Sequence, residues 1–227
     1  EKGLVASLLW LEEAVQPRRD VKIPGVSISA WVQYVLDNFA TVDEAVKALE
    51  KEDVQIVDLF LPEGVSATLH LAISDASGDN AIFEYIDGKL IIHHDPSYVV
   101  MTNSPTFDKQ LALNEYWKEI GGSVMLPGTE RAADRFVRAS HYTNSIPKTG
   151  DGLLGVATAL SVIRNCSVPL GVGTPGQPNV ASTLWRTVCD HRDKVYYFES
   201  AFSPNLFWIS LKDVNLNEGA PVLKLSM

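Results

Sequence analysis

The strongest constraint on the fold is a stretch from Ser66 to Thr102 in which the pattern of apolar and polar residues has a period of two. The apolar members of its first part are Ala67, Leu69, Leu71 and Ile73. Residues two positions apart share one face of a strand, so this period predicts a strand with one buried face. Asp87-Gly88 then separates residues 81–86 from residues 89–94, which is typical of a tight hairpin. We therefore predict three successive antiparallel strands, and a fourth that ends at Asn103.

Helical periodicity lies on both sides of this stretch. Residues 28–39 carry apolar side chains at helical spacing, and Thr41-Val42-Asp43-Glu44 has the capping-box pattern that opens a second helix. After a break at Gly121-Gly122, further helices are predicted at residues 130–141 and 153–164. Pro169 to Pro178 reads as irregular, and three more strands are expected at residues 183–189, 194–201 and 205–211.

The chain opens with an apolar run, Val5 to Leu11, which predicts a strand buried on both faces. Strands, helices, helices and strands follow one another in a segregated order, which favours an α+β fold with antiparallel sheets over a parallel βαβ sheet. Two sheets sandwiched by helix layers would bury such a strand on both faces. No linker, low-complexity tract or internal repeat divides the chain, so we predict that residues 1–227 are a single domain.

Composition argues against some classes of partner. The formal net charge is -9 at pH 7 and the 19 basic residues are scattered, which argues against a nucleic-acid partner. No apolar run approaches the roughly 18 residues of a membrane helix, so no membrane insertion is expected. The two cysteines, Cys166 and Cys189, are too few for a disulfide scaffold, and we expect each to be a small buried apolar residue.

The histidines do not form a recognisable metal site. His93 and His94 are adjacent on a predicted strand and point to opposite faces, so they cannot easily share one ion. His70, His141 and His191 have no acidic or cysteine partner at ligand spacing. The sequence also has no Gly-rich phosphate loop. We therefore predict no metal and no cofactor.

Asn103 is the first candidate site residue, because an apolar run stops abruptly in Thr102-Asn103-Ser104-Pro105. Pro105 cannot continue a sheet ladder, so the Asn103 amide would be held on a stiff edge. One interpretation is an Asx turn, in which the side chain bonds to its own backbone. The other is a donor aimed at an oxyanion, as in acyl-transfer sites. Spacing alone leaves both open.

Three arginines, Arg131, Arg135 and Arg138, share one face of a predicted helix. They form either a solvated, salt-bridged face or a set from which one guanidinium turns into a pocket. In the second case it would hold a carboxylate or lower the pKa of a nucleophile. Trp10, on the first strand, reads most simply as a core residue.

Taken together, four blocks resemble the choloylglycine hydrolase family, which comprises penicillin V acylases and conjugated bile salt hydrolases. The blocks are Glu1–Leu4 with the apolar strand after it, Trp31–Asp37, Thr102–Asp108 and Asp134–Arg138. The resemblance runs from Glu1 to the C-terminus in the right order. It implies an N-terminal nucleophile hydrolase with a four-layer αββα fold, two antiparallel sheets between helix layers, which agrees with the sandwich expected above.

The resemblance also implies residue roles. In such enzymes the first residue of the mature chain is a cysteine whose thiolate attacks an amide, with its own α-amino group as base. Asn103 matches the oxyanion-hole asparagine, the backbone N–H of Trp10 the second donor, and Arg135 the site arginine near the nucleophile. Neither Cys166 nor Cys189 matches the nucleophile. The resemblance therefore implies that the cysteine lies upstream of this chain and that residues 1–227 alone are inactive.

In two features this sequence resembles the penicillin V acylases of Gram-negative bacteria. The position of Trp10 is typically asparagine in bile salt hydrolases and aromatic in penicillin V acylases, so we expect the Trp10 ring to bind the acyl group of the substrate. The connection between Trp117 and Pro127 is short, as in Gram-negative members, which are commonly exported and some of which also cleave acyl-homoserine lactones.

The resulting expectation is a penicillin V acylase-like hydrolase of linear, non-peptide amides. Its substrate would be a small molecule, and the protein would be a periplasmic or secreted homotetramer by resemblance. One alternative within the same class is a conjugated bile salt hydrolase. The alternative from another class is a non-catalytic remnant that binds ligand only.

Overall fold

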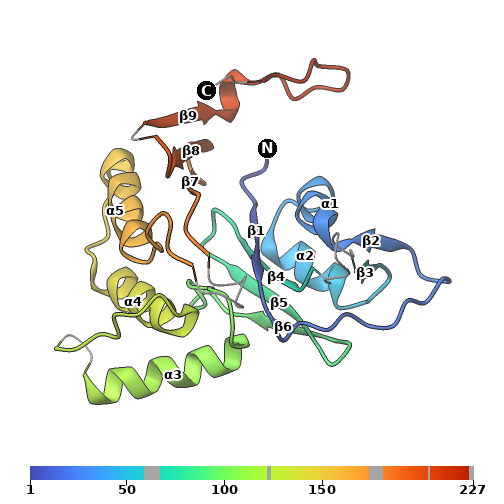
Figure 1. Cartoon of the computed structure of the whole chain (residues 1–227). Helices are drawn as coiled ribbons and strands as arrows, with labels where there is room; N and C mark the ends of the chain where they lie inside the picture. Colours follow the sequence, from blue (N-terminus) through green and yellow to red (C-terminus); the bar gives the residue numbers. More distant parts are fainter. Residues whose placement is uncertain (59–66, 122–123, 174–180, 204, 225–227) are drawn as a thin grey trace.

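The computed structural model describes residues 1–58, 67–121, 124–173, 181–203 and 205–224. The helices and strands are β1 (Val5–Trp10), β2 (Gly25–Ser27), α1 (Trp31–Asn38), α2 (Val42–Leu49), β3 (Gln55–Val57), β4 (Leu69–Ser74), β5 (Asn80–Ile86), β6 (Lys89–His94), α3 (Phe107–Ile120), α4 (Ala132–Ser145), α5 (Gly152–Asn165), β7 (Trp185–Asp190), β8 (Val195–Ser200) and β9 (Leu206–Ser210) (Figure 1). Single 3-10 turns precede α1 and follow β9.

Two antiparallel sheets dominate the fold. One has the strand order β1-β4-β5-β6 and the other the order β7-β8-β9. The prediction of an α+β fold with antiparallel sheets is confirmed. A short parallel pair, β2 and β3, was not predicted, because each strand is only three residues long.

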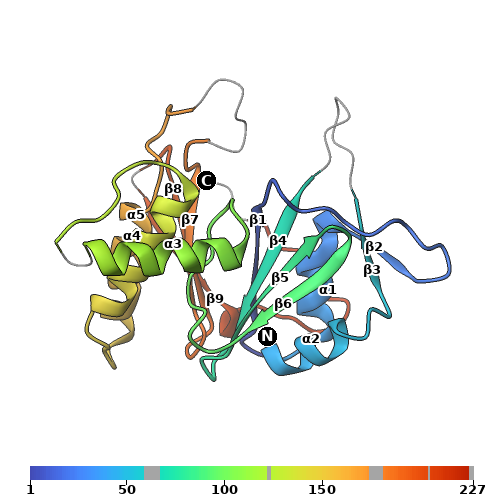
Figure 2. The ribbon, with the colours of Figure 1, turned by 90° about the horizontal axis from the view of Figure 1, so that it is seen from below.

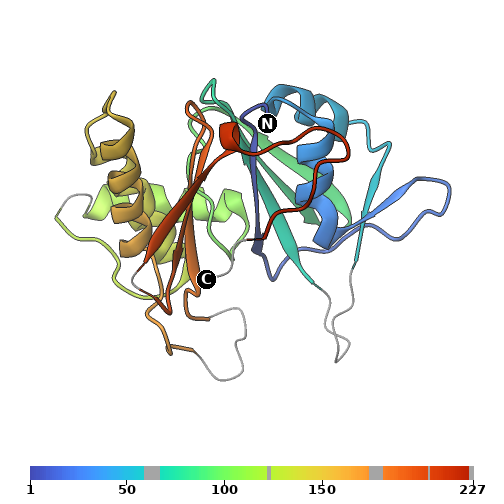
Figure 3. The ribbon, with the colours of Figure 1, turned by 90° about the horizontal axis from the view of Figure 1, so that it is seen from above.

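The two sheets lie side by side, with helices outside them. Figure 3 shows α1 and α2 against one side of the four-stranded sheet, the three-stranded sheet on its other side, and α5 beyond that. Figure 2, the opposite view, shows α3 and α4 on the same side of the molecule as α5. The segment between β6 and α3 therefore runs from the four-stranded sheet to the side of the molecule where α3, α4 and α5 lie.

The larger buried cluster fills the space between α1, α2 and the four-stranded sheet. At its centre the ring of Trp31 packs edge-on against Phe83, with ring centroids 6.4 Å apart, and against Tyr85 at 5.7 Å. Each fully buried side chain of this size contributes about 1.5–3 kcal/mol. A smaller cluster of Ile82, Phe107 and Phe136 fixes the starts of α3 and α4 beside the other face of β5.

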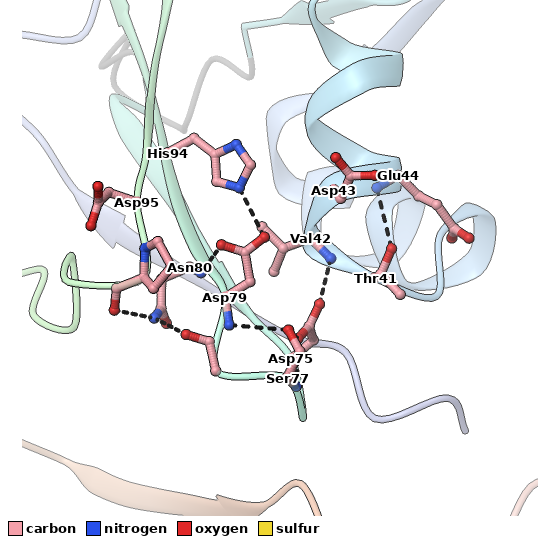
Figure 4. Close-up of polar contacts among 12 residues, drawn as sticks. Thr41, Val42, Asp43, Glu44, Asp75, Ser77, Asp79, Asn80, His94 and Asp95 are labelled. Carbon is pink, nitrogen blue, oxygen red and sulfur yellow. Dashed lines mark hydrogen bonds and ion pairs between the residues drawn. The ribbon is translucent and has the colours of Figure 1, made fainter.

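The start of α2 is tied to the β4–β5 turn (Figure 4). Thr41 Oγ1 accepts the backbone N–H of Glu44 at 3.2 Å, so the predicted helix start and its cap are confirmed. The Glu44 carboxylate accepts the N–H of Ala40 at 2.8 Å, one residue before the Thr41 N–H that a capping box uses. Asp75 Oδ2 accepts the N–H of Val42 at 2.8 Å. The bonds to Val42 and Glu44 satisfy helix N–H groups that have no partner within the helix.

The predicted fourth strand is wrong, because residues 95–106 form no strand. Side chains take the place of a neighbouring strand along part of this segment. His70 Nε2 lies 2.7 Å from the carbonyl oxygen of Thr102, and Gln110 Nε2 donates to the carbonyls of Asn103 and Pro105. The backbone carbonyls are thus satisfied without a sheet.

Helix α3 was missed by the sequence analysis. Its buried residues are Phe107, Gln110 and Asn114, so two of the three are polar. A helix with a polar buried face does not show the apolar period by which amphipathic helices are recognised.

The expectation that the first strand is buried on both faces is wrong. The residues of β1 are half-buried, and Ser7 is exposed. In the part of the chain that the structure describes, β1 pairs with β4 alone and forms the edge of its sheet. The other predicted helices and strands agree with the structure to within a few residues, and Pro169 to Pro178 lies partly outside the described residues.

Candidate active site

The structure brings Trp10, Asn103 and Arg135 together. Asn103 Nδ2 donates to the backbone carbonyl of Trp10 at 2.9 Å. Arg135 Nη2 donates to Asn103 Oδ1 at 2.8 Å. Both bonds connect the Asn103 amide to other parts of the fold, unlike an Asx turn, in which the side chain bonds to its own backbone.

These two partners determine how the amide is oriented. A guanidinium can only donate and a carbonyl can only accept, so Oδ1 must face Arg135 and Nδ2 must face Trp10. Nδ2 carries two hydrogens, and the bond to Trp10 uses one. The second N–H of Asn103 can therefore donate to a ligand.

The backbone N–H of Trp10 lies on the same side of β1 as its carbonyl. The N–H of Leu11 donates to Thr68 at 3.1 Å, so Leu11 faces β4. Along a strand, the N–H and C=O of one residue point to the same side, and successive residues alternate. Trp10 therefore directs both groups away from β4, towards Asn103. Two N–H donors, one from Trp10 and one from Asn103, border the same region.

A cavity of about 600 Å³ lies beside these residues. Leu9, Asn103 and Arg135 line it, and Glu13 and Thr183 contribute polar groups. Leu9 and Trp10 are adjacent on β1, so their side chains point to opposite faces. Trp10 is not among the residues that line this cavity, and the expected contact of its ring with substrate stays a prediction.

Buried polar side chains hold the backbone around Asn103. His70 and Gln110, which are 0% and 1% exposed, bind the carbonyls of Thr102 and Asn103 respectively. Neither His70 nor Gln110 was predicted to belong to the site. The signal that could have identified them is a polar residue at a position where the strand or helix faces the core. For Gln110 this signal is usable only once α3 itself has been predicted.

Arg135 and Arg138 lie on α4, and Arg131 precedes it and lines the cavity with Arg135. None of the three forms an ion pair within the described residues, so they do not make a salt-bridged face there. Arg138 Nη1 donates to the carbonyls of Pro127 and Thr129, at 2.7 and 2.9 Å. Arg135 turns to Asn103, and burial lowers its pKa, although a guanidinium stays charged at neutral pH. Arg135 therefore agrees with the second interpretation of the sequence, in which one guanidinium turns into a pocket.

Both cysteines are half-buried, so the expectation that each is a buried residue was wrong. Burial raises the pKa of Cys166, against the opposing effect of Arg138 and Arg135. Burial raises the pKa of Cys189 to about 11. The reactive form of cysteine is the thiolate, and burial disfavours this form in both residues.

Adjacent histidines on β6 have different partners, as expected for neighbouring strand residues. His93 Nε2 lies 3.4 Å from a carboxylate oxygen of Glu84, and His94 Nε2 lies 2.8 Å from Asp79 Oδ2. Among the residues placed by the structure, no group of three or more histidine, cysteine or acidic side chains could hold a metal ion. Within the same residues, none of the helices has the length and apolar character needed to cross a bilayer.

Comparison with known proteins gives one family. Residues 1–224 match the family model of the linear amide C–N hydrolases, choloylglycine hydrolase family. The chain is 54% identical over 244 residues to the penicillin V acylase of Pectobacterium atrosepticum, which covers all of this chain and 65% of that protein. It is 26% identical over 244 residues to a bile salt hydrolase/transferase of Clostridium perfringens, across 96% of this chain and 72% of the relative.

A solved structure gives the same result. The penicillin V acylase of Agrobacterium tumefaciens has 60% sequence identity and a TM-score of 0.88, over 96% of this chain and 66% of that one. The chain thus spans about two thirds of the length of the two penicillin V acylases that it resembles.

Proposed function

The chain belongs to the choloylglycine hydrolase family of linear amide C–N hydrolases, and from this membership we propose that the complete protein hydrolyses a linear, non-peptide amide as a penicillin V acylase does. The observation that carries the proposal is the Asn103 amide, held between the Trp10 carbonyl and Arg135, with a second Nδ2 hydrogen that bonds to no residue in the described part of the chain. Such a donor, fixed before the substrate arrives, is the arrangement that stabilises a developing oxyanion.

The proposed nucleophile is a cysteine at the N-terminus of the mature protein, in the third of the acylases' length that this chain does not span. Its thiolate attacks the amide carbonyl carbon, and the carbonyl oxygen becomes an oxyanion that accepts from Asn103 Nδ2 and the N–H of Trp10. The C–N bond then breaks, the amine leaves with a proton from the α-ammonium group, and water hydrolyses the thioester. Burial of Cys166 and Cys189 supports a nucleophile other than these two.

Arg135 has two proposed roles at this site. Its bond to Oδ1 keeps the Nδ2 of Asn103 turned towards the reacting carbonyl. Its charge, weakly hydrated in a half-buried position, would also favour the thiolate form of a nearby cysteine.

The complete fold is proposed to be a single-domain, four-layer αββα sandwich. The order of helices, sheet, sheet and helix in Figure 3 supports it, as does the TM-score of 0.88 with the Agrobacterium acylase. Export to the periplasm or beyond, and assembly as a homotetramer, are proposed on family resemblance. The Gram-negative origin of the Pectobacterium relative supports export.

The proposed substrate is penicillin V or another small amide with an aromatic or long aliphatic acyl group, with acyl-homoserine lactones as a further class. The identity of 54% with a penicillin V acylase, against 26% with a bile salt hydrolase/transferase, supports this choice. We also propose that the ring of Trp10 contacts the acyl group. Trp10→Asn keeps both backbone groups, and we expect it to lower the preference for penicillin V over glycocholate by about tenfold.

The test uses the complete protein with its native N-terminus, assayed with penicillin V and glycocholate at matched concentrations. We expect faster hydrolysis of penicillin V, and loss of that activity in Asn103→Ala. Faster hydrolysis of glycocholate would replace the proposal with a bile salt hydrolase. If correctly processed protein hydrolyses neither compound nor an acyl-homoserine lactone, a role in ligand binding without catalysis takes its place.

A further inference from the structure

A fully buried pair of ionisable side chains lies directly behind the site. His70 on β4 and Glu84 on β5 are 0% and 1% exposed. His70 Nδ1 lies 3.0 Å from Glu84 Oε1, and His70 Nε2 lies 2.7 Å from the carbonyl oxygen of Thr102. That carbonyl belongs to the peptide that joins Thr102 to Asn103.

The partners of His70 determine which of its ring nitrogens donate. A backbone carbonyl can only accept, so Nε2 must carry a hydrogen. Both oxygens of Glu84 accept the N–H of Phe107 at 3.1 Å, as expected for an ionised carboxylate at the start of a helix. Burial by itself would raise the pKa of Glu84, but the hydrogen bonds of His70 and Phe107 and the nearby ring of His93 bring it down to about 2. An ionised carboxylate can only accept, so opposite such a Glu84 the Nδ1 of His70 donates as well, and the two contacts together place a hydrogen on each ring nitrogen.

We propose that His70, held as an imidazolium by Glu84, is a positioning residue that fixes the Asn103 amide through the carbonyl of Thr102. A peptide unit is planar, so a bond to its oxygen also fixes the direction in which the next residue continues. A charged donor makes this bond shorter and stronger than a neutral one would. The catalytic part of this inference rests on the proposed function, because it takes Asn103 as the oxyanion donor.

The other ionisable groups around the pair are few in the part of the chain that the structure describes. His93 on β6 lies 3.4 Å from Glu84 Oε2, and Asp108 on α3 is close enough for its pKa to be influenced by Glu84. Among the described residues, His70 bonds to Glu84 and Thr102, and Thr102 bonds to His70, Gln110 and Ala132, so neither His93 nor Asp108 is a partner of His70 or Thr102. The contact from β4 to the Asn103 peptide is therefore made by His70.

Two conservative variants separate positioning from simple stabilisation of the core. The amide nitrogen of glutamine reaches about as far as Nε2 of histidine, and that of asparagine about as far as Nδ1. His70→Gln therefore keeps the donor to Thr102 and loses the one to Glu84. His70→Asn keeps the donor to Glu84 and loses the one to Thr102.

In the complete protein assayed with penicillin V, we expect His70→Asn to lower kcat by roughly 10²-fold with little change in KM. His70→Gln should retain most of kcat. A purely structural role predicts the reverse order, because His70→Gln deprives the buried carboxylate of Glu84 of a donor. In an Asn103→Ala background, His70→Asn should cost little further activity, since the two residues act in series. Equal losses in both backgrounds would overturn the proposal.

A second measurement does not depend on activity. We expect the ¹⁵N resonances of the His70 ring to show two protonated nitrogens at neutral pH, and one in Glu84→Gln. The side-chain amide resonances of Asn103 should shift in His70→Asn and stay near their native positions in His70→Gln. A neutral His70 ring in the native protein, or Asn103 resonances that are the same in all three proteins, would overturn the inference. If the protein hydrolyses no amide, the proposed function fails while these spectra still decide the role of His70.

Discussion

Arg135 Nη2 donates to Asn103 Oδ1 across 2.8 Å, so a residue of α4 decides which way the amide at the end of the β6–α3 segment points. Without this donor, the amide could rotate and place its oxygen towards Trp10. Two acceptors would then face each other, and the N–H needed for an oxyanion would be turned away. The site depends on this relationship as much as on the presence of an asparagine.

The first prediction concerns Asn103 itself. Asn103→Ala removes one oxyanion donor, so kcat for penicillin V should fall by roughly 10²–10³-fold. Steady-state kinetics of the complete protein measures this. Asn144→Ala is the matched control, because Asn144 is an exposed asparagine that bonds within its own helix, α4. Unchanged kcat in Asn103→Ala would remove Asn103 from the site.

The second prediction concerns the geometry of the arginine. Arg135→Lys keeps the positive charge but loses the planar guanidinium that reaches Asn103, so kcat should fall by about tenfold or more. Arg138→Lys, three residues further along α4, should retain activity, because a lysine can still donate to the two carbonyls that Arg138 binds. Equal activity in the two variants would show that only charge matters at position 135.

The third prediction is a pH dependence of stability that arises from Glu84. Its pKa falls from an ordinary value of 4.5 to about 2 on folding, which corresponds to about 3 kcal/mol. A carboxyl whose pKa is lowered by folding stabilises the protein fully above about pH 4.5, and this contribution is lost as the pH falls towards about 2. Urea unfolding of native protein and Glu84→Gln should show a gap in unfolding free energy that narrows over this range. A gap that does not change with pH would contradict the assignment.

The fourth prediction concerns the cap of α2. Thr41→Ala removes the acceptor for the N–H of Glu44, and should lower the free energy of unfolding by about 1 kcal/mol. Thr41→Ser keeps an oxygen at the same place and should lose much less. Chemical denaturation measures both, and kcat should stay unchanged because no residue of α2 lines the cavity beside Asn103. A loss of kcat in a folded Thr41→Ala protein would link this turn to the site.

Local patterns in the sequence determined much of the framework. The alternation of residues 69–74 and the turn at Asp87-Gly88 predicted the β4–β6 meander, and the Thr41–Glu44 pattern predicted where α2 begins. These predictions succeed because each depends on residues close together in the sequence. The resemblance of a few blocks to one family identified Trp10, Asn103 and Arg135 as candidates, and the structure then placed them within hydrogen-bonding distance.

Tertiary structure alone decided what surrounds Asn103. The segment before α3 reads as a strand, yet His70 and Gln110 bind its carbonyls, and these residues lie on two other elements. Periodicity reports the burial of apolar side chains, and it cannot reveal that a histidine, a glutamate or a glutamine is buried. Burying such a group is favourable only when partners satisfy it, and the partners of His70 are 14 and 32 residues away in the chain. Only the folded chain brings them together.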